Sequence, residues 1–337
     1  MIRVFENTDI STRNSFHVHQ RAAKIVEFDY NEELPEVFAT HVGEKWMALG
    51  GGNNILFTKD IDSTLVVPCN KDIEIVGKED GRVTVRVGAG LEWDEFVEWC
   101  VKRELWGVEN LSLIPGKVGA APVQNIGAYG AEVRDCITRV EMFFPEQGNF
   151  ITLAAEHCGF GYRESVFKHS LKGRVIITSV EFCLSETPHP KLGYGDVIQQ
   201  VEELGGATLS NIRKAICSIR RNKLPDTTVT GNAGSFFKNP IVDSSIAESL
   251  LEQYPDIPHY PAGVEGKTKL AAGWLIDKCS LKGYSKGNVG VHHKQALVLI
   301  NTTGEATGCE VIEFAKMVQK SVFDKFGIEI DTEVNII

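Results

Sequence analysis

The chain has 337 residues, of which 43% are hydrophobic and 24% charged, and its formal net charge is -10. This is the composition of a globular protein with room for two or three domains. The acidic balance argues against nucleic acid or an anionic membrane as a partner, although a few local cations or amides could still bind a phosphorylated ligand. No run is apolar enough for a membrane span, and the start lacks the order of a secretory signal. We therefore expect a cytoplasmic protein.

Neither the cysteines nor the histidines suggest a metal site. The eight cysteines are scattered and none forms Cys-x-x-Cys, which predicts reduced, mostly buried thiols. The pairs His17/His19 and His292/His293 lack nearby carboxylates at ligand spacing. We expect no bound metal.

In chain order, short apolar runs separated by turns come first and predict strands at 45–49, 65–68, 74–76 and 83–87. The last of them, VTVRV, alternates with period two, as a half-buried strand does. Apolar residues at helical spacing then predict an amphipathic helix over 93–105. A strand over 174–184 and a helix ending near Lys223 follow.

The pattern of expected helices and strands changes after Pro240. Helices are expected at 245–254, 270–279 and 310–326, and strands at 295–301 and in the final IEIDTEVNII. Leu224-Pro225-Asp226 ends the preceding helix and marks a domain boundary near 223–226. No internal repeat is visible, and the pattern is that of an α+β protein with mixed sheets, not of a regular βαβ series.

Two glycine-rich segments stand out. KWMALGGGNNILF (45–57) is a strand running into three glycines and two asparagines, where backbone N–H groups can converge on an anion. It is neither a P-loop nor a GxGxxG turn, and a plain tight turn is the alternative. SLIPGKVGAAPVQNIGAYG (112–130) is small, apolar and nearly uncharged, which suits close approach of backbone to a flat ligand; a buried loop of small residues is its alternative. Together they favour a large nucleotide cofactor without a Rossmann domain.

The decapeptide GNAGSFFKNP (231–240) places Ser235 between a flexible backbone and two phenylalanines. Its hydroxyl could be a nucleophile, a proton donor or a turn residue that bonds its own backbone. The absence of Gly-x-Ser-x-Gly argues against the nucleophile. The other two roles stay open from these residues alone.

Several of these stretches, in this order, resemble the UDP-N-acetylenolpyruvoylglucosamine reductase family, whose members make UDP-N-acetylmuramate for bacterial peptidoglycan. The matching motifs run nearly end to end: GGGNN, IPGKVGAAPVQNIGAYG, FGYRESVFK, RNKLPD, GNAGSFFKNP, KLAAGWLID, HHKQALVLIN and a final Thr-Glu-Val. KLGYGD (191–196) resembles the form of the family whose tyrosine-bearing loop closes over substrate.

The resemblance implies an FAD-binding fold of the vanillyl-alcohol oxidase/PCMH type with a separate α+β substrate domain. Residues 1–70 and 71–222 would form the two FAD-binding subdomains, the second completed by 325–337. Residues 223–324 would bind the UDP-sugar, and a monomer is expected. The boundary near 223–226, found independently, agrees with this division.

The resemblance also implies the chemistry. NADPH reduces FAD and leaves, the enolpyruvyl sugar takes the same place, and flavin N5 delivers hydride to the terminal carbon. Ser235 matches the proton donor, while Arg163 and Glu333 match the groups that stabilise the developing charge. A structural ion pair for Arg163 and an exposed strand face for Glu333 are the alternatives.

The remaining matches are binding residues. Those implied for the substrate are Tyr162, Tyr194, Lys223, Asn239, Lys269 and Gln295. Those implied for FAD are Gly50, Gly51, Gly52, Asn53, Asn54, Gly116, Gly119, Ala120, Gln124, Asn125, Gly127 and Ala128. Asn53 and His17 depart from the family's usual serine and glycine.

Two competing functions remain. The first is a flavin oxidase of the same fold with another substrate, and the proton donor Ser235 argues against it, since alcohol oxidation needs a base. The second is a UDP-sugar-binding protein without flavin chemistry, and the intact glycine segments argue against that.

Overall fold

The computed structural model describes residues 1–337, and its contacts divide the chain into two compact units. The first comprises Met1–Thr8, Ala22–Gly51 and Ile61–Asn222, and the second comprises Asp9–Arg21, Gly52–Asp60 and Lys223–Ile337. One break thus falls beside the boundary predicted near 223–226. The three-domain division stays a prediction, because the first unit does not separate 1–70 from 71–222, and 325–337 belongs to the second unit.

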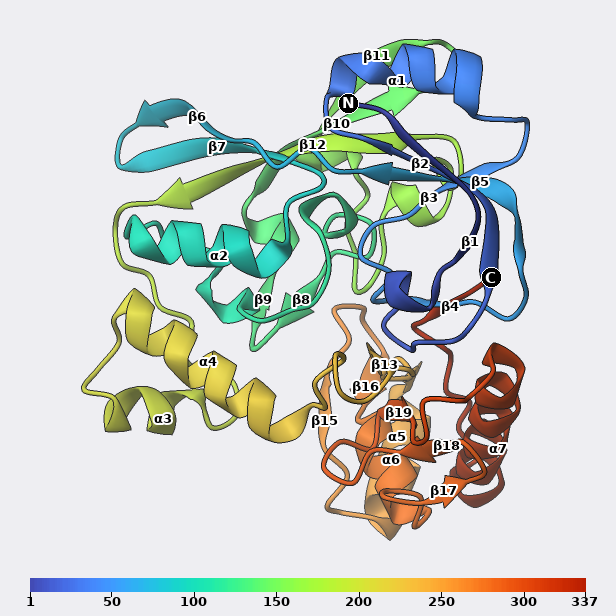
Figure 1. Ribbon diagram of the computed structural model, residues 1–337. Helices are drawn as coiled ribbons and strands as arrows, with labels where there is room; N and C mark the ends of the chain where they lie inside the picture. Colours follow the sequence, from blue (N-terminus) through green and yellow to red (C-terminus); the bar gives the residue numbers. More distant parts are fainter. The chain divides into compact units, whose positions relative to one another are not determined.

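The first unit contains a four-stranded sheet in the order β1-β2-β5-β3 (Figure 1). Its strands are β1 (Arg3–Asp9), β2 (Arg21–Phe28), β5 (Ile61–Pro68) and β3 (Trp46–Ala48). Both β2 and β3 pair in parallel with β5. The helical stretch beside this sheet runs through η2 (Asn31–Glu33), α1 (Leu34–Glu36) and the π-turn η3 (Val37–His41).

A five-stranded antiparallel sheet is the larger layer of the first unit, in the order β11-β10-β12-β7-β6. The strands are β6 (Ile73–Glu79), β7 (Arg82–Gly88), β10 (Ile137–Phe144), β11 (Asn149–Ala154) and β12 (Ile176–Ser185). Helix α2 (Trp93–Lys102) lies along it (Figure 1) and packs Phe96 against Phe182, with ring centroids 4.7 Å apart. Offset aromatic contacts of this kind anchor a helix on a sheet.

Short helical turns and two short strands connect the longer elements of the first unit. They are η4 (Glu109–Leu111), η5 (Val118–Ala120), β8 (Gly127–Ala128), β9 (Ala131–Glu132), η6 (Val133–Asp135), η7 (Ala155–His157) and η8 (Val166–Lys168). The unit ends in α3 (Val197–Glu203) and α4 (Leu209–Lys223), which bury Val197, Ile212 and Ile216 in one cluster with Trp106.

The second unit is built from three small sheets. The first is β13 (Asn232–Ser235), β19 (Val298–Asn301), β18 (Val289–Val291) and β17 (Ser285–Lys286). The second is β14 (Ile241–Asp243), β16 (Lys267–Leu270) and β15 (His259–Pro261), and β4 (Ile55–Leu56) pairs with β20 (Asn335–Ile336) in the third. Its helices are η1 (Ser11–Arg13), α5 (Ser244–Gln253), α6 (Ala272–Lys278) and α7 (Gly308–Phe326).

Helix α7 shows why the sequence folds this way locally. Thr307 and Glu310 form a capping box at its start, and Gly327 ends it with φ of 67°, a conformation that glycine adopts without strain. Gly308 at its first turn packs so tightly that a Cβ would lie 2.0 Å from the carbonyl oxygen of Phe57. This contact attaches the helix to residues 52–60.

The expected helices are confirmed to within a few residues: 93–105, 245–254, 270–279 and 310–326 correspond to α2, α5, α6 and α7. The alternation of 83–87 is confirmed in β7, whose side chains are alternately buried and exposed along most of its length. The final strand is mostly wrong, because only Asn335–Ile336 forms one, with an isolated bridge at Thr332. The chain there pairs first with residues 236–238 and then with residues 54–58, instead of forming one continuous ladder.

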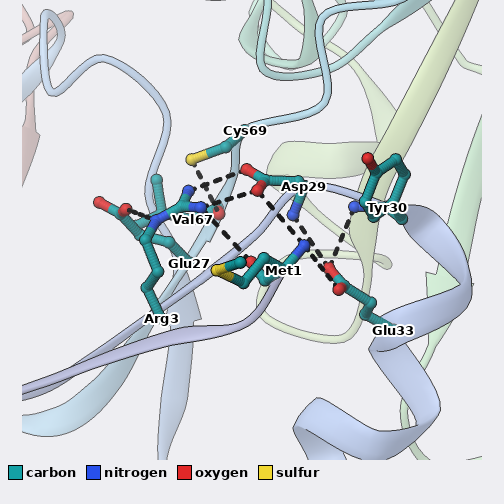
Figure 2. Close-up of polar contacts among 8 residues, drawn as sticks. All are labelled: Met1, Arg3, Glu27, Asp29, Tyr30, Glu33, Val67 and Cys69. Carbon is teal, nitrogen blue, oxygen red and sulfur yellow. Dashed lines mark hydrogen bonds and ion pairs between the residues drawn. The ribbon is translucent and has the colours of Figure 1, made fainter.

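An ion-pair network joins β1 to the end of β2 in the first unit (Figure 2). The Arg3 Nε donates to Glu27 at 2.9 Å, and its Nη1 donates to Asp29 at 2.7 Å. These hydrogen bonds from Arg3 lower the pKa of Asp29 to about 2. The network is partly exposed and stabilises the sheet edge rather than forming a ligand site.

Three other features bear on function. All eight cysteines are free thiols, and burial raises the pKa of Cys136 to about 12. No cluster of three or more His, Cys, Asp or Glu side chains could hold a metal ion. None of the helices is both long and apolar enough to cross a membrane.

Candidate functional site

The loop that follows β3 exposes a row of unused backbone donors. The N–H groups of Gly50, Gly51, Gly52 and Asn53 donate no hydrogen bond to another protein atom. Gly52 has φ of 65°, and a Cβ there would lie 2.1 Å from the carbonyl oxygen of Arg13. Consecutive unpaired amides are donors suited to an anion such as a pyrophosphate.

The segment 112–130 presents mainly backbone. Gly116 has φ of 122° and its N–H donates to no protein atom, while Leu113, Asn125 and Tyr129 also have positive φ. A Cβ on Gly119 would lie 2.6 Å from that of Ala89. Such conformations at non-glycine residues are strained and concentrate at functional sites. The segment is therefore a folded ribbon whose close backbone approach depends on small residues.

The two glycine segments meet inside the first unit. A Cβ on Gly50 would lie 3.5 Å from that of Ala120, which is ordinary contact. Asn125 is fully buried and donates to the carbonyl oxygen of Gly161 and to Glu132, at 2.9 and 3.0 Å. Asn125 therefore holds the ribbon against the turn that carries Arg163, and its side chain is structural here.

Arg163 sits at the tip of a tight turn in which Gly161 and Glu164 exchange backbone hydrogen bonds. Its φ is 57°, a left-handed conformation that costs a non-glycine residue about 1–2 kcal/mol. Its Nη2 donates to the carbonyl oxygen of Gly127 at 2.8 Å, and its guanidinium lies 5.4 Å from the ring of Tyr162. The fold thus places this half-buried arginine on the 112–130 ribbon.

In the second unit, Ser235 ends β13 opposite Val298 of β19. The next residue, Phe236, is fully buried and pairs with two stretches of chain. Its N–H donates to Leu297 at 2.7 Å, and its carbonyl accepts from the N–H of Glu333 at 2.8 Å. Phe236 therefore holds Ser235 and Glu333, 98 residues apart in sequence, on neighbouring stretches.

Asn54 joins the same group. Its Nδ2 donates to the carbonyl of Glu333 at 3.4 Å, and its own carbonyl accepts from the backbone and side chain of Asn335, each at 3.0 Å. Gly234 has φ of 71°, and no atom lies within 4 Å of a Cβ placed there. The space beside Ser235 is therefore open on its glycine side.

Four further expected residues lie in the second unit. Asn239 accepts at Oδ1 from the N–H of Ala272 at 3.0 Å, which fixes the start of α6. The Gln295 Oε1 would lie 3.4 Å from a Cβ on Gly273 in the same helix, so α6 brings Asn239 and Gln295 together. Lys269 lies in β16 with its Nζ 6.0 Å from the ring of Tyr260. Lys223 is exposed and is the first residue of this unit's last segment, Lys223–Ile337.

Tyr194 belongs to the first unit and is 47% exposed. Its ring meets that of Tyr129 edge-on, with centroids 6.0 Å apart. Because Tyr129 closes the 112–130 ribbon, the tyrosine segment lies at the ribbon's end. In the second unit, Asn54, Ser235 and Glu333 form one group, and Asn239 and Gln295 meet separately at α6.

Comparison with known proteins shows which family the chain belongs to. Residues 225–337 match the C-terminal domain of UDP-N-acetylenolpyruvoylglucosamine reductase, and residues 23–154 match an FAD-binding domain. Proteins named UDP-N-acetylenolpyruvoylglucosamine reductase are 45% identical in Bacteroides fragilis, over 97% of this chain and 98% of theirs, and 44% identical in Chromobacterium violaceum, over 97% of each. The chain belongs to the UDP-N-acetylenolpyruvoylglucosamine reductase family.

The fold agrees with that of a solved reductase. The crystal structure of the Thermus caldophilus UDP-N-acetylenolpyruvylglucosamine reductase is similar with a TM-score of 0.71, at 24% identity over 100% of this chain and 99% of that one. The expected FAD-binding fold with a separate substrate domain is thereby confirmed, as is the family that the motifs resemble.

The residues present fit FAD. The free amides of Gly50 to Asn53 suit the pyrophosphate, and the ribbon 112–130 leaves backbone accessible to a flat ring system. Arg163 packs closely on Gly127, where a Cβ would lie 3.1 Å from the arginine Nη1. The assignment of the individual expected residues to FAD stays a prediction.

Sequence reasoning missed Arg220. This half-buried arginine of α4 donates from Nε to the carbonyl of Leu113 at 3.2 Å and lies beside the Tyr129 hydroxyl, so it touches both ends of the ribbon. It forms no ion pair, because the nearby Asp94 is held by both Nη atoms of Arg213. Burial lowers the pKa of Arg220. The only signal in the sequence was an arginine on a helix three residues before Lys223.

Proposed function

We propose how this chain performs the reductase reaction of its family, the step of peptidoglycan synthesis that converts the enolpyruvyl ether of UDP-N-acetylenolpyruvoylglucosamine to UDP-N-acetylmuramate. NADPH is the electron donor and FAD the carrier. The chemistry that FAD supplies when bound is hydride transfer, from NADPH and then to the terminal carbon of the enolpyruvyl group. The chain's own residues bind both substrates, stabilise negative charge and supply one proton.

Ser235 donates that proton to the carbon beside the carboxylate. The observation that carries this role is the double pairing of Phe236, which fixes Ser235 at the end of β13 and sets Glu333 next to it. A hydroxyl is a weak acid in water, but a carbanion-like carbon is a strong base, and the fully buried rings of Phe236 and Phe237 exclude water on one side. The glycine on the other side leaves room for the substrate.

Arg163 stabilises the charge that develops on the substrate carboxylate. A guanidinium stays protonated and pairs with a carboxylate through two hydrogen bonds. Its left-handed backbone and its bond to Gly127 hold it in one orientation before substrate arrives. Glu333 is the second polar group of this step. Its backbone is fixed by Phe236 and Asn54.

The remaining residues bind the nucleotide sugar. Tyr194 and Lys223 contact the diphosphate, and Asn239, Lys269 and Gln295 contact the UDP-sugar, while Tyr162 lines the pocket beside Arg163. Arg220, a buried cation without a carboxylate partner, supplies positive charge to an anionic group bound along the ribbon. The cytoplasmic location and the monomeric state stay predictions.

The test is anaerobic and uses the purified protein with FAD. Flavin absorbance that bleaches with NADPH and returns on adding the enolpyruvyl sugar supports both half-reactions. Flavin that stays reduced after the sugar is added would contradict the substrate and favour another flavin oxidoreductase of the same fold. A protein that takes up no FAD would contradict the proposal at its start.

A further inference from the structure

Asn110 occupies an unusual position for a polar side chain. It lies in the η4 turn directly before the 112–130 ribbon and is only 2% exposed. The turn around it is rigid, because Glu109 accepts from the N–H of Gly107 at 2.7 Å and the Ser112 hydroxyl donates to the Glu109 carbonyl at 2.6 Å. Asn110 is therefore held in place independently of any ligand.

Both amide hydrogens of Asn110 are used, and each goes to a different segment. The Nδ2 donates to the carbonyl of Tyr129, at the end of the ribbon, at 2.8 Å. It also donates to the carbonyl of Lys191, at the start of the KLGYGD segment, at 2.7 Å. Because both neighbours are carbonyl oxygens, the amide group can only face them with its NH₂ side.

The other end of the same amide has no partner. Asn110 Oδ1 is buried and accepts no hydrogen bond. The residue also lines a cavity of about 160 Å³, together with Glu109 and Lys191. Leaving a buried acceptor unsatisfied lowers the stability of the fold. The unsatisfied Oδ1 does not stabilise the fold. The asparagine is therefore explained by its two donated hydrogen bonds, which join Tyr129 and Lys191.

The segment that Asn110 holds is fixed at its base and carries glycines near its tip. Lys191 is tied at its carbonyl by Asn110 and at its Nζ by Asp135, at 2.6 Å. Tyr194, three residues on, is exposed and stands between Gly193 and Gly195, the latter with φ of 58°. The backbone dihedral angles of the two glycines can change at little cost, whereas the start of the segment at Lys191 is held by Asn110.

We propose that Asn110 is a positioning residue, which ties the tyrosine segment 191–196 to the ribbon 112–130 and so sets where Tyr194 can reach a bound UDP-sugar. The inference rests on the proposed function of Tyr194 as a diphosphate contact. Asn110 itself touches neither substrate nor cofactor. Its effect on substrate affinity passes through Tyr194.

The experiment is a double-mutant cycle on the FAD-loaded protein. Asn110→Leu keeps the volume but removes both donors, so the carbonyls of Tyr129 and Lys191 lose this partner and the melting temperature should fall, while the fold is retained. We expect the Kd for the enolpyruvyl sugar to rise about tenfold, equivalent to about 1.4 kcal/mol, with FAD content unchanged. Hydrogen exchange in 188–196 should become faster. In a Tyr194→Ala background, Asn110→Leu should change Kd less than twofold.

Lys191→Met is the matched control, since it removes the ion pair to Asp135 but keeps the carbonyl that Asn110 holds. It should leave Kd within twofold. An unchanged Kd in Asn110→Leu, or an equal loss with and without Tyr194, would overturn the proposal. The unsubstituted protein is tested first, and its reduced flavin must be reoxidised by the sugar. If it is not, the proposed function fails, and this result is distinct from a failure of the role of Asn110.

Discussion

The candidate groups of the two units are formed by different kinds of structure. In the first unit the ribbon 112–130 is continuous in sequence and offers backbone, with strained conformations at Leu113, Asn125 and Tyr129. In the second unit the group is made of side chains on separate stretches, joined only because Phe236 pairs with residues near 297 and 333. Backbone sites of the first kind are visible in one sequence, whereas sites of the second kind depend on pairing across the chain.

Apart from the proton donor Ser235, the largest effect should come from Arg163, whose side chain donates to the carbonyl of Gly127 in the ribbon. Arg163→Gln removes the charge but can keep a hydrogen bond to Gly127, so we expect flavin reduction by NADPH to persist and oxidation by the sugar to slow about 100-fold or more. Rapid mixing of each half-reaction measures this. Arg134→Gln, on the exposed side of the same region, is the control. Equal rates for Arg163→Gln and the unsubstituted protein would remove Arg163 from the reaction.

Two neighbouring glycines sharpen the comparison. Gly52→Ala forces a Cβ into the carbonyl of Arg13 at a positive φ, so it should lower the unfolding free energy by at least about 2 kcal/mol. Gly50→Ala meets only Ala120 at ordinary distance, so its melting temperature should hold while FAD affinity falls severalfold. Thermal unfolding and flavin titration separate the two. A stable Gly52→Ala would show that the loop is less tightly packed than the structure indicates.

These particulars also show what the sequence could predict. The two glycine segments, the amphipathic helices and the break near Lys223 follow from local composition and periodicity. Arg220 and Asn110 could not be found that way, because their hydrogen-bond partners lie 19 to 107 residues away in sequence. The final strand was mispredicted for the same reason, since its pairing alternates between two partners.

A smaller effect is expected at Arg220. Arg220→Met removes an unpaired buried cation, so FAD-free protein should unfold at the same or a higher temperature, while affinity for an anionic ligand should weaken by about 1 kcal/mol. Arg221→Met, at the exposed neighbouring residue, should change neither the unfolding temperature nor the affinity for the anionic ligand. Melting curves without FAD and titrations with FAD and with the sugar distinguish these outcomes. Loss of stability without loss of binding would make Arg220 a structural residue.

The smallest effect should come from the ion-pair network of Figure 2, which serves only the sheet edge. The pKa of Asp29 is lowered from 3.8 to about 2 by Arg3, so its contribution to stability is present above pH 4 and is lost as the pH falls from 4 to 2. The gap in unfolding free energy between Arg3→Met and the unsubstituted protein should therefore be largest above pH 4 and shrink towards pH 2. A gap that does not vary with pH would contradict the assigned pair.

The central claim is that Ser235 supplies the proton, and one measurement tests it most directly. Ser235→Ala, loaded with FAD, is mixed anaerobically with NADPH and then with the enolpyruvyl sugar. We predict that reduction proceeds within about twofold of the unsubstituted rate, while reoxidation slows by about 10² to 10⁴, the usual range for losing a general acid. Reoxidation at the unsubstituted rate, or an equal slowing of both half-reactions, would contradict the account.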